Sequence, residues 1–241
     1  MSGPHSHIGA SSMHRWMNCP GSVRLSRLAQ PLPQSPAAAE GTKAHELAAK
    51  LLQGKSIDET IVDMDAVLTY VKLLSQELYA ATYSSIEKEF DGEKFYPGFF
   101  GTCDAVAYYR REKLLRVYDY KHGKGHRVEV ENNVQCLYYA FGAILEFGLL
   151  FEIDTIEMVI VQPRMPNRRG EVVHRWQCDY EAIIDFGLLF LRAAEETKKE
   201  DSKLTEGAWC YWCPAVKDCP EQFKKTSERI RAKFTTDNFK Y

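Results

Sequence analysis

The sequence lacks any long apolar run. No stretch in its 241 residues approaches the roughly 18 apolar residues that a membrane-spanning helix needs. The first residues, "MSGPHSHIGASS", also lack the basic-then-apolar layout of a secretory signal. These two absences predict a cytoplasmic protein that does not associate with a membrane.

The sequence also lacks a strong net charge. The formal net charge is -2, so the overall balance does not indicate a nucleic-acid partner, and any such binding must use local basic patches. Two patches are present, "KHGKGHR" at 121–127 and "PRMPNRRGEVVHR" at 163–175. Each patch, taken by itself, is typical of a solvated loop.

Internal repeats and long low-complexity linkers are absent as well. The content of 45% hydrophobic and 27% charged residues is ordinary for a soluble globular protein. The first 36 residues contain short polar and proline-rich pieces, and Ser35 with Pro36 then predicts a capped helix start. Helices are expected at 36–54, 63–83, 132–147 and 180–199, and strands at 84–90, 98–110, 113–121, 155–163 and 172–179. This order predicts an α/β fold with a mixed central sheet flanked by helices.

Two aspartates converge if the second and third strands form a tight hairpin. With a turn at residues 111–112, residue 110 pairs with 113, and Asp104 lies directly across from Asp119 at a Cβ distance of about 5 Å. Lys121 shares the face of Asp119, whereas a one-residue slip would separate the aspartates. Clustered carboxylates suit Mg²⁺ or Mn²⁺, and a neighbouring lysine can orient or help deprotonate a water. Such a site suits metal-assisted hydrolysis of a phosphodiester.

Three further polar residues stand near this hairpin in the sequence order. Gln135 and Tyr139 lie on one face of the following helix because they are four residues apart. His45 lies in the first long helix, within "EGTKAHE". Taken singly, each has a simpler interpretation: a rim glutamine, a half-buried tyrosine, and a surface or capped histidine.

Together these motifs resemble a known family. "EGTKAH" at 40–45, "GTCD" at 101–104, "DYK" at 119–121 and "QCLYY" at 135–139 occur in that order. The series resembles the RecB-type branch of the PD-(D/E)XK nucleases, and especially its phage-borne members. The resemblance covers roughly residues 40–140 and implies a restriction-endonuclease-like core.

The resemblance also implies a role for each matching residue. His45, Asp104 and Asp119 would be ligands of a divalent metal, together with the main-chain carbonyl of Tyr120. Lys121 would be the catalytic lysine. Gln135 and Tyr139 would support the site and contact the DNA backbone. This sequence has Asp119 where many relatives have glutamate, and the shorter side chain affects the metal spacing.

Basic residues near the site are candidate contacts for DNA phosphates. The candidates in the first patch are Lys124, His126 and Arg127. Weaker candidates in the second patch are Arg164, Arg168, Arg169 and Arg175.

Three of the seven cysteines are closely spaced. Cys210, Cys213 and Cys219 form C-x2-C-x5-C, a density of thiols that suggests a metal or cluster site. The isolated Cys103, Cys136 and Cys178 are instead expected to be small buried hydrophobic residues.

The same resemblance extends to these cysteines. The AddB nuclease domain and the CRISPR-adaptation nucleases of this branch bind a [4Fe–4S] cluster through one upstream and three downstream cysteines, which here match Cys19 and Cys210, Cys213 and Cys219. A structural Zn²⁺ site is the alternative, although zinc sites more often use two short pairs. Either group would join the two ends of the chain. We therefore expect a single nuclease domain over 1–241, with an N-terminal segment at 1–36, a nuclease core at 37–200 and a cluster-binding segment at 201–241.

The function implied is a metal-dependent DNA exonuclease in phage DNA recombination, replication or repair, acting in the host cytoplasm. Two alternatives stay open: a structure-specific DNA endonuclease, and a non-catalytic DNA-binding recombination accessory protein. A homo-oligomer or a phage recombination partner is compatible with each of these functions.

Overall fold

The chain forms two compact units. The computed structural model describes residues 6–30 and 33–235, with side chains to residue 233. The first unit comprises residues 1–10 and 34–188, and the second comprises 11–33 and 189–241. A single domain over 1–241 stays a prediction. None of the described helices is long and apolar enough to cross a membrane.

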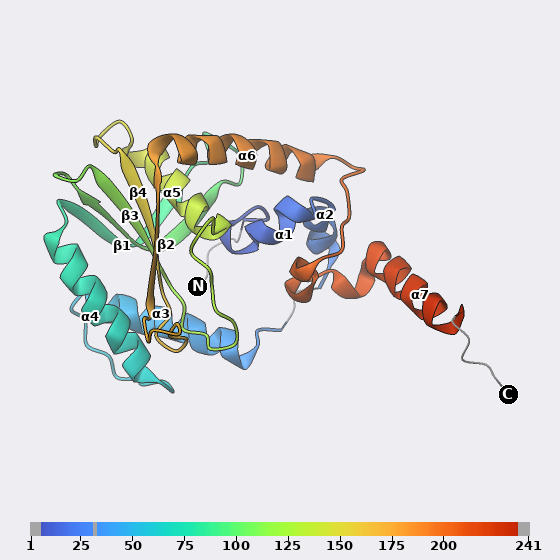
Figure 1. Cartoon of the computed structure of the whole chain (residues 1–241), viewed down its shortest axis with the longest axis horizontal. Coiled ribbons are helices and arrows are strands. Elements are labelled where there is room, and N and C mark those ends of the chain that lie inside the picture. The colour runs from blue at the N-terminus through green and yellow to red at the C-terminus, as the bar shows by residue number, and fades with distance from the viewer. Residues whose placement is uncertain (1–5, 31–32, 236–241) are drawn as a thin grey trace. The chain divides into compact units, whose positions relative to one another are not determined.

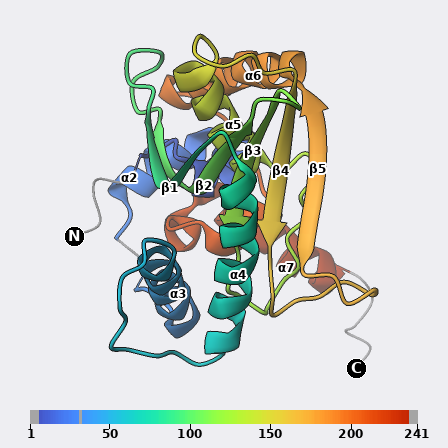
Figure 2. The same cartoon turned by 90° about the vertical axis from the view of Figure 1, so that its left-hand side faces the viewer.

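A five-stranded mixed sheet forms the centre of the first unit. Its strands lie in the order β1 (Tyr83–Asp91), β2 (Phe100–Tyr109), β3 (Leu114–Tyr120), β4 (Thr155–Val161) and β5 (Val173–Asp179). Only β3 and β4 run parallel, and the other neighbouring pairs are antiparallel. Figure 2 shows the strands side by side in this order. The predicted mixed sheet is confirmed.

Helix α5 (Val134–Phe147) connects the two parallel strands and covers one face of the sheet. It begins at Asn133, whose side chain accepts hydrogen bonds from the backbone N–H groups of Gln135 and Cys136, each at 3.1 Å. Such a cap satisfies donors that the first turn of a helix leaves free. Phe99 stacks on Tyr138 below it, with ring centroids 4.4 Å apart.

Helices α3 (Pro36–Leu52) and α4 (Met64–Ala80) cover the opposite face (Figure 1). The predicted cap of α3 is confirmed, because the Ser35 hydroxyl accepts a hydrogen bond from the Ala38 N–H at 3.1 Å. The apolar side chains of both helices pack on alternate residues of the strands, including Tyr118 and Tyr120. Tyr70 stacks on Tyr120 with a centroid distance of 4.5 Å.

The second unit is built from both ends of the chain. It contains α1 (Met13–Asn18), α2 (Gly21–Leu28), the second half of α6 (Tyr180–Lys198) and α7 (Pro220–Thr235), with 3-10 turns η2 (Ala208–Trp212) and η3 (Val216–Asp218). A third 3-10 turn, η1 (Ala10–Ser12), lies where the first unit passes into the second.

Helices α1 and α2 lie within the first 36 residues, where the sequence predicts no helix. Met13, Trp16 and Val23 are buried, and Trp16 packs edge-on against Phe190 at 5.7 Å. These short helices gain their stability from that packing, which the polar local composition does not reveal.

The isolated cysteines fit their prediction in two positions out of three. Cys103 and Cys136 are buried, whereas Cys178 is only partly buried. All seven cysteines are free thiols.

A buried carboxylate links three strands of the sheet. Glu157 on β4 accepts hydrogen bonds from Arg116 on β3, from Arg175 on β5 at 2.9 Å and from Gln177 on β5 at 2.7 Å. Its side chain is only 5% exposed, so its charge depends on these partners.

We expect Glu157→Ala to destabilise the protein by about 3 kcal/mol, because two arginines lose their shared carboxylate. Urea unfolding followed by circular dichroism measures this change. Glu112→Ala, at an exposed position in the β2–β3 turn, is the matched control and should leave the midpoint unchanged. Equal unfolding midpoints for the two variants would contradict the importance of this network.

Candidate functional site

The β2–β3 hairpin has the predicted register. Tyr109 pairs with Leu114 and Ala105 pairs with Tyr118, which places Asp104 opposite Asp119 at the next position. The Tyr120 N–H donates a hydrogen bond to Asp104 Oδ2 at 2.6 Å, so the two strands stay joined at this end. The two aspartates therefore come from neighbouring strands and lie beside each other, as the sequence predicts.

Asp119 starts a chain of polar contacts that crosses from β3 to α5. Lys121 Nζ donates to Asp119 Oδ1 at 3.1 Å and to Gln135 Oε1 at 2.8 Å. Gln135 Nε2 donates in turn to the Tyr139 hydroxyl at 3.3 Å. These four residues, predicted as an aspartate–lysine pair on the strand and a glutamine–tyrosine pair on the helix, form one connected group. Tyr139 is buried rather than half-buried.

Burial and charge act in opposite directions on this group. Burial raises the pKa of Asp119, Lys121 lowers it, and Asp104 raises it again, so the pKa of Asp119 lies above its ordinary value. Burial would lower the pKa of Lys121, but Asp119 outweighs that effect and the pKa of Lys121 is raised. The lysine therefore stays protonated at neutral pH and acts as a hydrogen-bond donor.

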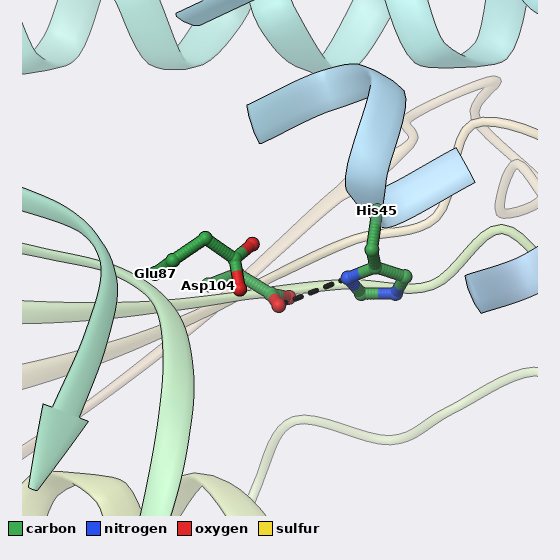
Figure 3. Close-up of side chains that lie close together, drawn as sticks. All are labelled: His45, Glu87 and Asp104. Carbon is green, nitrogen blue, oxygen red and sulfur yellow. Dashed lines mark hydrogen bonds and ion pairs between the residues drawn. The ribbon is translucent and has the colours of Figure 1, made fainter. Parts of the chain in front are cut away.

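His45 approaches Asp104 from the other side. In Figure 3, His45 projects from α3 toward Asp104, and its Nδ1 lies 2.9 Å from Asp104 Oδ1. Burial would lower the pKa of His45, yet the Asp104 carboxylate raises it above the ordinary value. The helix that carries the histidine is thus joined to the strand that carries the first aspartate.

Glu87 is a third member of this cluster that the sequence did not identify. One ligand atom from each of His45, Glu87 and Asp104 lies within 4.8 Å of the others (Figure 3). Glu87 has a left-handed backbone (φ 49°) and drops out of the β1–β2 ladder between Ile86 and Lys88. Such a backbone is costly for a non-glycine residue, and strain of this kind gathers at functional sites.

Glu87 also has a perturbed acidity. Burial and the neighbouring Asp104 carboxylate raise the pKa of Glu87 to about 7. A divalent cation between these carboxylates would relieve the repulsion, and a set of carboxylate oxygens with one imidazole is compatible with Mg²⁺ or Mn²⁺. Among the described residues, this trio is the group that the geometry brings within reach of one ion. Asp119, in contrast, is engaged by Lys121.

The glycine-rich loop after β3 has a fixed shape. Gln162, a buried residue, donates to the carbonyls of Gly123 at 3.0 Å and His126 at 2.9 Å, and accepts from the Val128 N–H at 3.1 Å. The predicted phosphate contacts of this loop, Lys124, His126 and Arg127, are all exposed on its surface. The hydrogen bonds of Gln162 therefore hold the backbone of the loop, and its basic side chains are exposed to solvent.

The second basic patch is partly structural. Arg164 is almost buried and pairs with Glu40 at 3.0 Å and Asp63 at 2.7 Å. Arg175 pairs with Glu157. Of the four arginines predicted as weaker phosphate contacts, only Arg168 and Arg169 are exposed and without an ion pair in the described part of the chain.

His122 extends the Arg164 network to the end of β3. It is buried, and its two ring nitrogens lie 2.8 Å from the Tyr120 hydroxyl and 3.3 Å from Glu40 Oε1. Burial lowers the pKa of His122, so this histidine is neutral at pH 7. The network fixes the start of α3 against the end of β3, and thereby positions His45.

The four cysteines predicted to share a site lie around one pocket in the second unit. Cys19, Cys210, Cys213 and Cys219 all line it. Cys19 Sγ accepts a hydrogen bond from the Thr205 N–H at 3.3 Å. Burial raises the pKa of Cys19, and the nearby thiols Cys210 and Cys213 raise it further. The two ends of the chain therefore bring four sulfur ligands together.

Comparison with known sequences places the chain in a family. A family model described as a protein of unknown function (DUF2800) matches residues 5–79 and 58–239. The chain belongs to the DUF2800 family.

Two solved structures resemble this DUF2800 chain. One is a phage related exonuclease from Haemophilus somnus 129PT, at 14% identity over 80% of this chain and 94% of that one, with a TM-score of 0.35. Another is an alkaline exonuclease (LHK-Exo) from Laribacter hongkongensis, at 11% identity over 90% and 99%, also with a TM-score of 0.35. Likeness at this level supports no conclusion about activity.

We expect Glu87→Gln to stabilise the metal-free protein at pH 8 but not at pH 5. The folded pKa of about 7 lies above the ordinary value of 4.5, so the contribution of this carboxyl to stability falls as the pH rises through 7. The gain at pH 8 should be on the order of 1 kcal/mol, because the side chain is partly solvated. Melting temperatures in EDTA at the two pH values measure it.

Glu89→Gln is the matched control for this test, because Glu89 is exposed on the same strand. It should shift neither melting temperature. An equal effect of Glu87→Gln at both pH values would show that the repulsion between Glu87 and Asp104 is absent.

Proposed function

We propose that the protein is a divalent-metal-dependent deoxyribonuclease that hydrolyses phosphodiester bonds. One observation carries the proposal: a buried aspartate–lysine pair at the end of β3 stands beside a cluster of two carboxylates and an imidazole. A purely structural ion pair does not require further carboxylates that repel it. Metal-assisted hydrolysis does, because a cation and a hydrogen-bond donor must both face the phosphate.

The residues that would hold the cation are His45, Glu87 and Asp104, with Asp119 and the Tyr120 carbonyl as the further ligands that the family resemblance implies. A bound Mg²⁺ or Mn²⁺ supplies Lewis-acid stabilisation of charge on the phosphate and promotes ionisation of the attacking water. The raised pKa of Glu87, which burial and Asp104 cause, supports this assignment. Occupancy by a cation would compensate the charge that the folded protein otherwise carries there.

Lys121 would act as a donor rather than as a base. Its pKa is raised despite burial, because Asp119 lies beside it. Its ammonium group would therefore orient the water and offset charge on the phosphate, while Asp119 and Gln135 fix its position. Tyr139 would hold Gln135 in turn and complete the wall of the site.

DNA is the substrate that the surrounding charges favour. Lys124, His126 and Arg127 would contact backbone phosphates without reading the sequence. Cleavage from an end, action in phage recombination, replication or repair in the host cytoplasm, and assembly with itself or a recombination partner belong to the same proposal. A structure-specific endonuclease is the second candidate enzyme. A non-catalytic accessory protein is less well supported, because a binding module gains nothing from carboxylates facing phosphate.

The second unit would hold a [4Fe–4S] cluster on Cys19, Cys210, Cys213 and Cys219. The common pocket supports a shared site for the four thiols, and their order in the sequence, one cysteine followed by three, favours a cluster over a single Zn²⁺ ion. Its role would be structural, because the four ligands come from both ends of the chain.

We expect Lys121→Ala to reduce cleavage of linear DNA by about 100-fold or more, because the donor beside the phosphate is lost. The measurement uses labelled linear and circular DNA with Mg²⁺, Mn²⁺ or EDTA. Wild-type protein should degrade the linear DNA only, and only with metal. Cutting of circles would replace the exonuclease by the endonuclease.

Lys94→Ala changes an exposed lysine in the connection between β1 and β2, outside the residues assigned to the site, and serves as the matched control. It should retain full activity. A fully active Lys121→Ala variant would refute the site assignment, and complete inactivity of the wild type with either metal would refute the proposed function.

We expect anaerobically purified protein to be brown, with broad absorption near about 400 nm and four irons per chain. Cys213→Ser should lose the absorption and the iron, because one thiolate ligand is removed. Cys178→Ser is the matched control, since Cys178 is a free thiol on β5, and should retain both. Stoichiometric zinc without iron in the wild type would decide for the zinc alternative.

A further inference from the structure

Two exposed aromatic side chains stand between the cysteines of the second unit. Tyr211 is 74% exposed and Trp212 is 67% exposed. Their rings contact each other edge to face, with centroids 4.6 Å apart and an interplanar angle of 87°. Large aromatic residues usually bury most of their surface, so an exposed pair is a feature that needs an explanation.

The two rings lie outside the pocket that the cysteines line. Residues 208–212 form a 3-10 turn that ends directly before Cys213. Cys210 and Cys213 line the pocket, whereas Tyr211 and Trp212 do not. Exposure at positions 211 and 212 does not require aromatic residues there.

The neighbouring Trp209 has a structural role, unlike this pair. Trp209 is partly buried, donates its ring N–H to the Thr205 carbonyl at 2.8 Å and packs edge-on against His14. Within the described residues, the rings of Tyr211 and Trp212 contact each other and no other aromatic ring. Their rings are thus available to a ligand with a flat apolar face.

Charge indicates which ligand this is. By sequence, the second unit carries 14 Lys and Arg against 9 Asp and Glu, although the whole chain has 31 against 33. The first unit accordingly has 17 basic and 24 acidic residues, so its positive charge is confined to local patches such as Lys124–Arg127. Lys217 and Lys224 are exposed close to the aromatic pair in the sequence and form no ion pair within the described residues.

We infer that Tyr211 and Trp212 are a stacking platform for the bases of single-stranded DNA, with Lys217 and Lys224 as contacts to its phosphates. The choice of DNA rests on the proposed nuclease function. Exposed aromatic rings beside positive charge bind single strands without sequence preference, because every base has a flat face. Bases in an intact duplex are already stacked, so the platform would take a single strand or a frayed end.

Fluorescence anisotropy in EDTA tests this inference on the full chain, because no cleavage occurs there. The probes are labelled dT20, an abasic strand of equal length and a blunt duplex. Wild-type protein should bind dT20 most tightly. The double variant Tyr211→Ala/Trp212→Ala should bind dT20 at least about fivefold more weakly and the abasic strand unchanged. Trp212→Phe, which keeps a ring, should retain most of the binding.

Two controls separate stacking from general effects. Tyr79→Ala removes a tyrosine that is 95% exposed in the first unit and should change nothing. Lys217→Glu and Lys224→Glu should weaken binding to dT20 and to the abasic strand alike, and lower the salt dependence.

Absorbance in each variant checks that the neighbouring cysteine site is intact. Tryptophan fluorescence provides a second readout of binding. Trp212 is the one tryptophan exposed to this degree in the described residues, so dT20 should quench wild-type fluorescence and the abasic strand should not. Lack of quenching, or equal binding of dT20 and the abasic strand by the wild type, would overturn the inference. So would a double variant that changes oligomeric state while binding dT20 normally, since the rings would then serve a protein contact.

The same probes distinguish this inference from the proposed function. Base-dependent binding without any metal-dependent cleavage would leave the platform in place and refute the nuclease. Metal-dependent cleavage with base-independent binding would support the nuclease and refute the platform.

Discussion

The burial of Asp119 next to Lys121 is the constraint on which the rest of the site depends. A lone carboxylate at the end of β3 would be neutral or would destabilise the sheet, because desolvation penalises its charge. The lysine two residues later points to the same face and favours the ionised form of the carboxylate. Gln135 then fixes the lysine, and the β2–β3 register brings Asp104 to the same end of the sheet. Each polar group is thereby placed by the need to satisfy its neighbour.

The parts of this site that depend on local structure can be predicted from the sequence. A short turn fixes a hairpin register, so the pairing that brings Asp104 to Asp119 followed from counting residues. The spacing of Gln135 and Tyr139 likewise followed from helix geometry, and the cap at Ser35 from chemistry confined to four residues. In each case a few consecutive residues determine the geometry.

Two features were not predictable because they depend on distant parts of the chain. Eight residues separate β1 from β2, so their register is not fixed by a turn, and Glu87 resembles any polar residue of a half-buried strand. Only the finished sheet places it next to Asp104. Helices α1 and α2 were also missed, because Trp16 packs on Phe190, and no local pattern shows a contact across that separation. Arg164 and Arg175 looked like surface charges because their partners are equally remote.

The pairing of the two chain ends has a consequence for synthesis. Gly21 N–H bonds to the Lys203 carbonyl at 3.0 Å, and Cys19 meets Thr205, so the second unit closes a loop of about 180 residues. During translation, α1 and α2 leave the ribosome about 180 residues before their partners exist. Residues 34–188 can already form their sheet in that interval. The second unit can therefore fold only after residues 189–219 have been made, and a chain that stops before them would retain the carboxylate site but leave Met13 and Trp16 exposed.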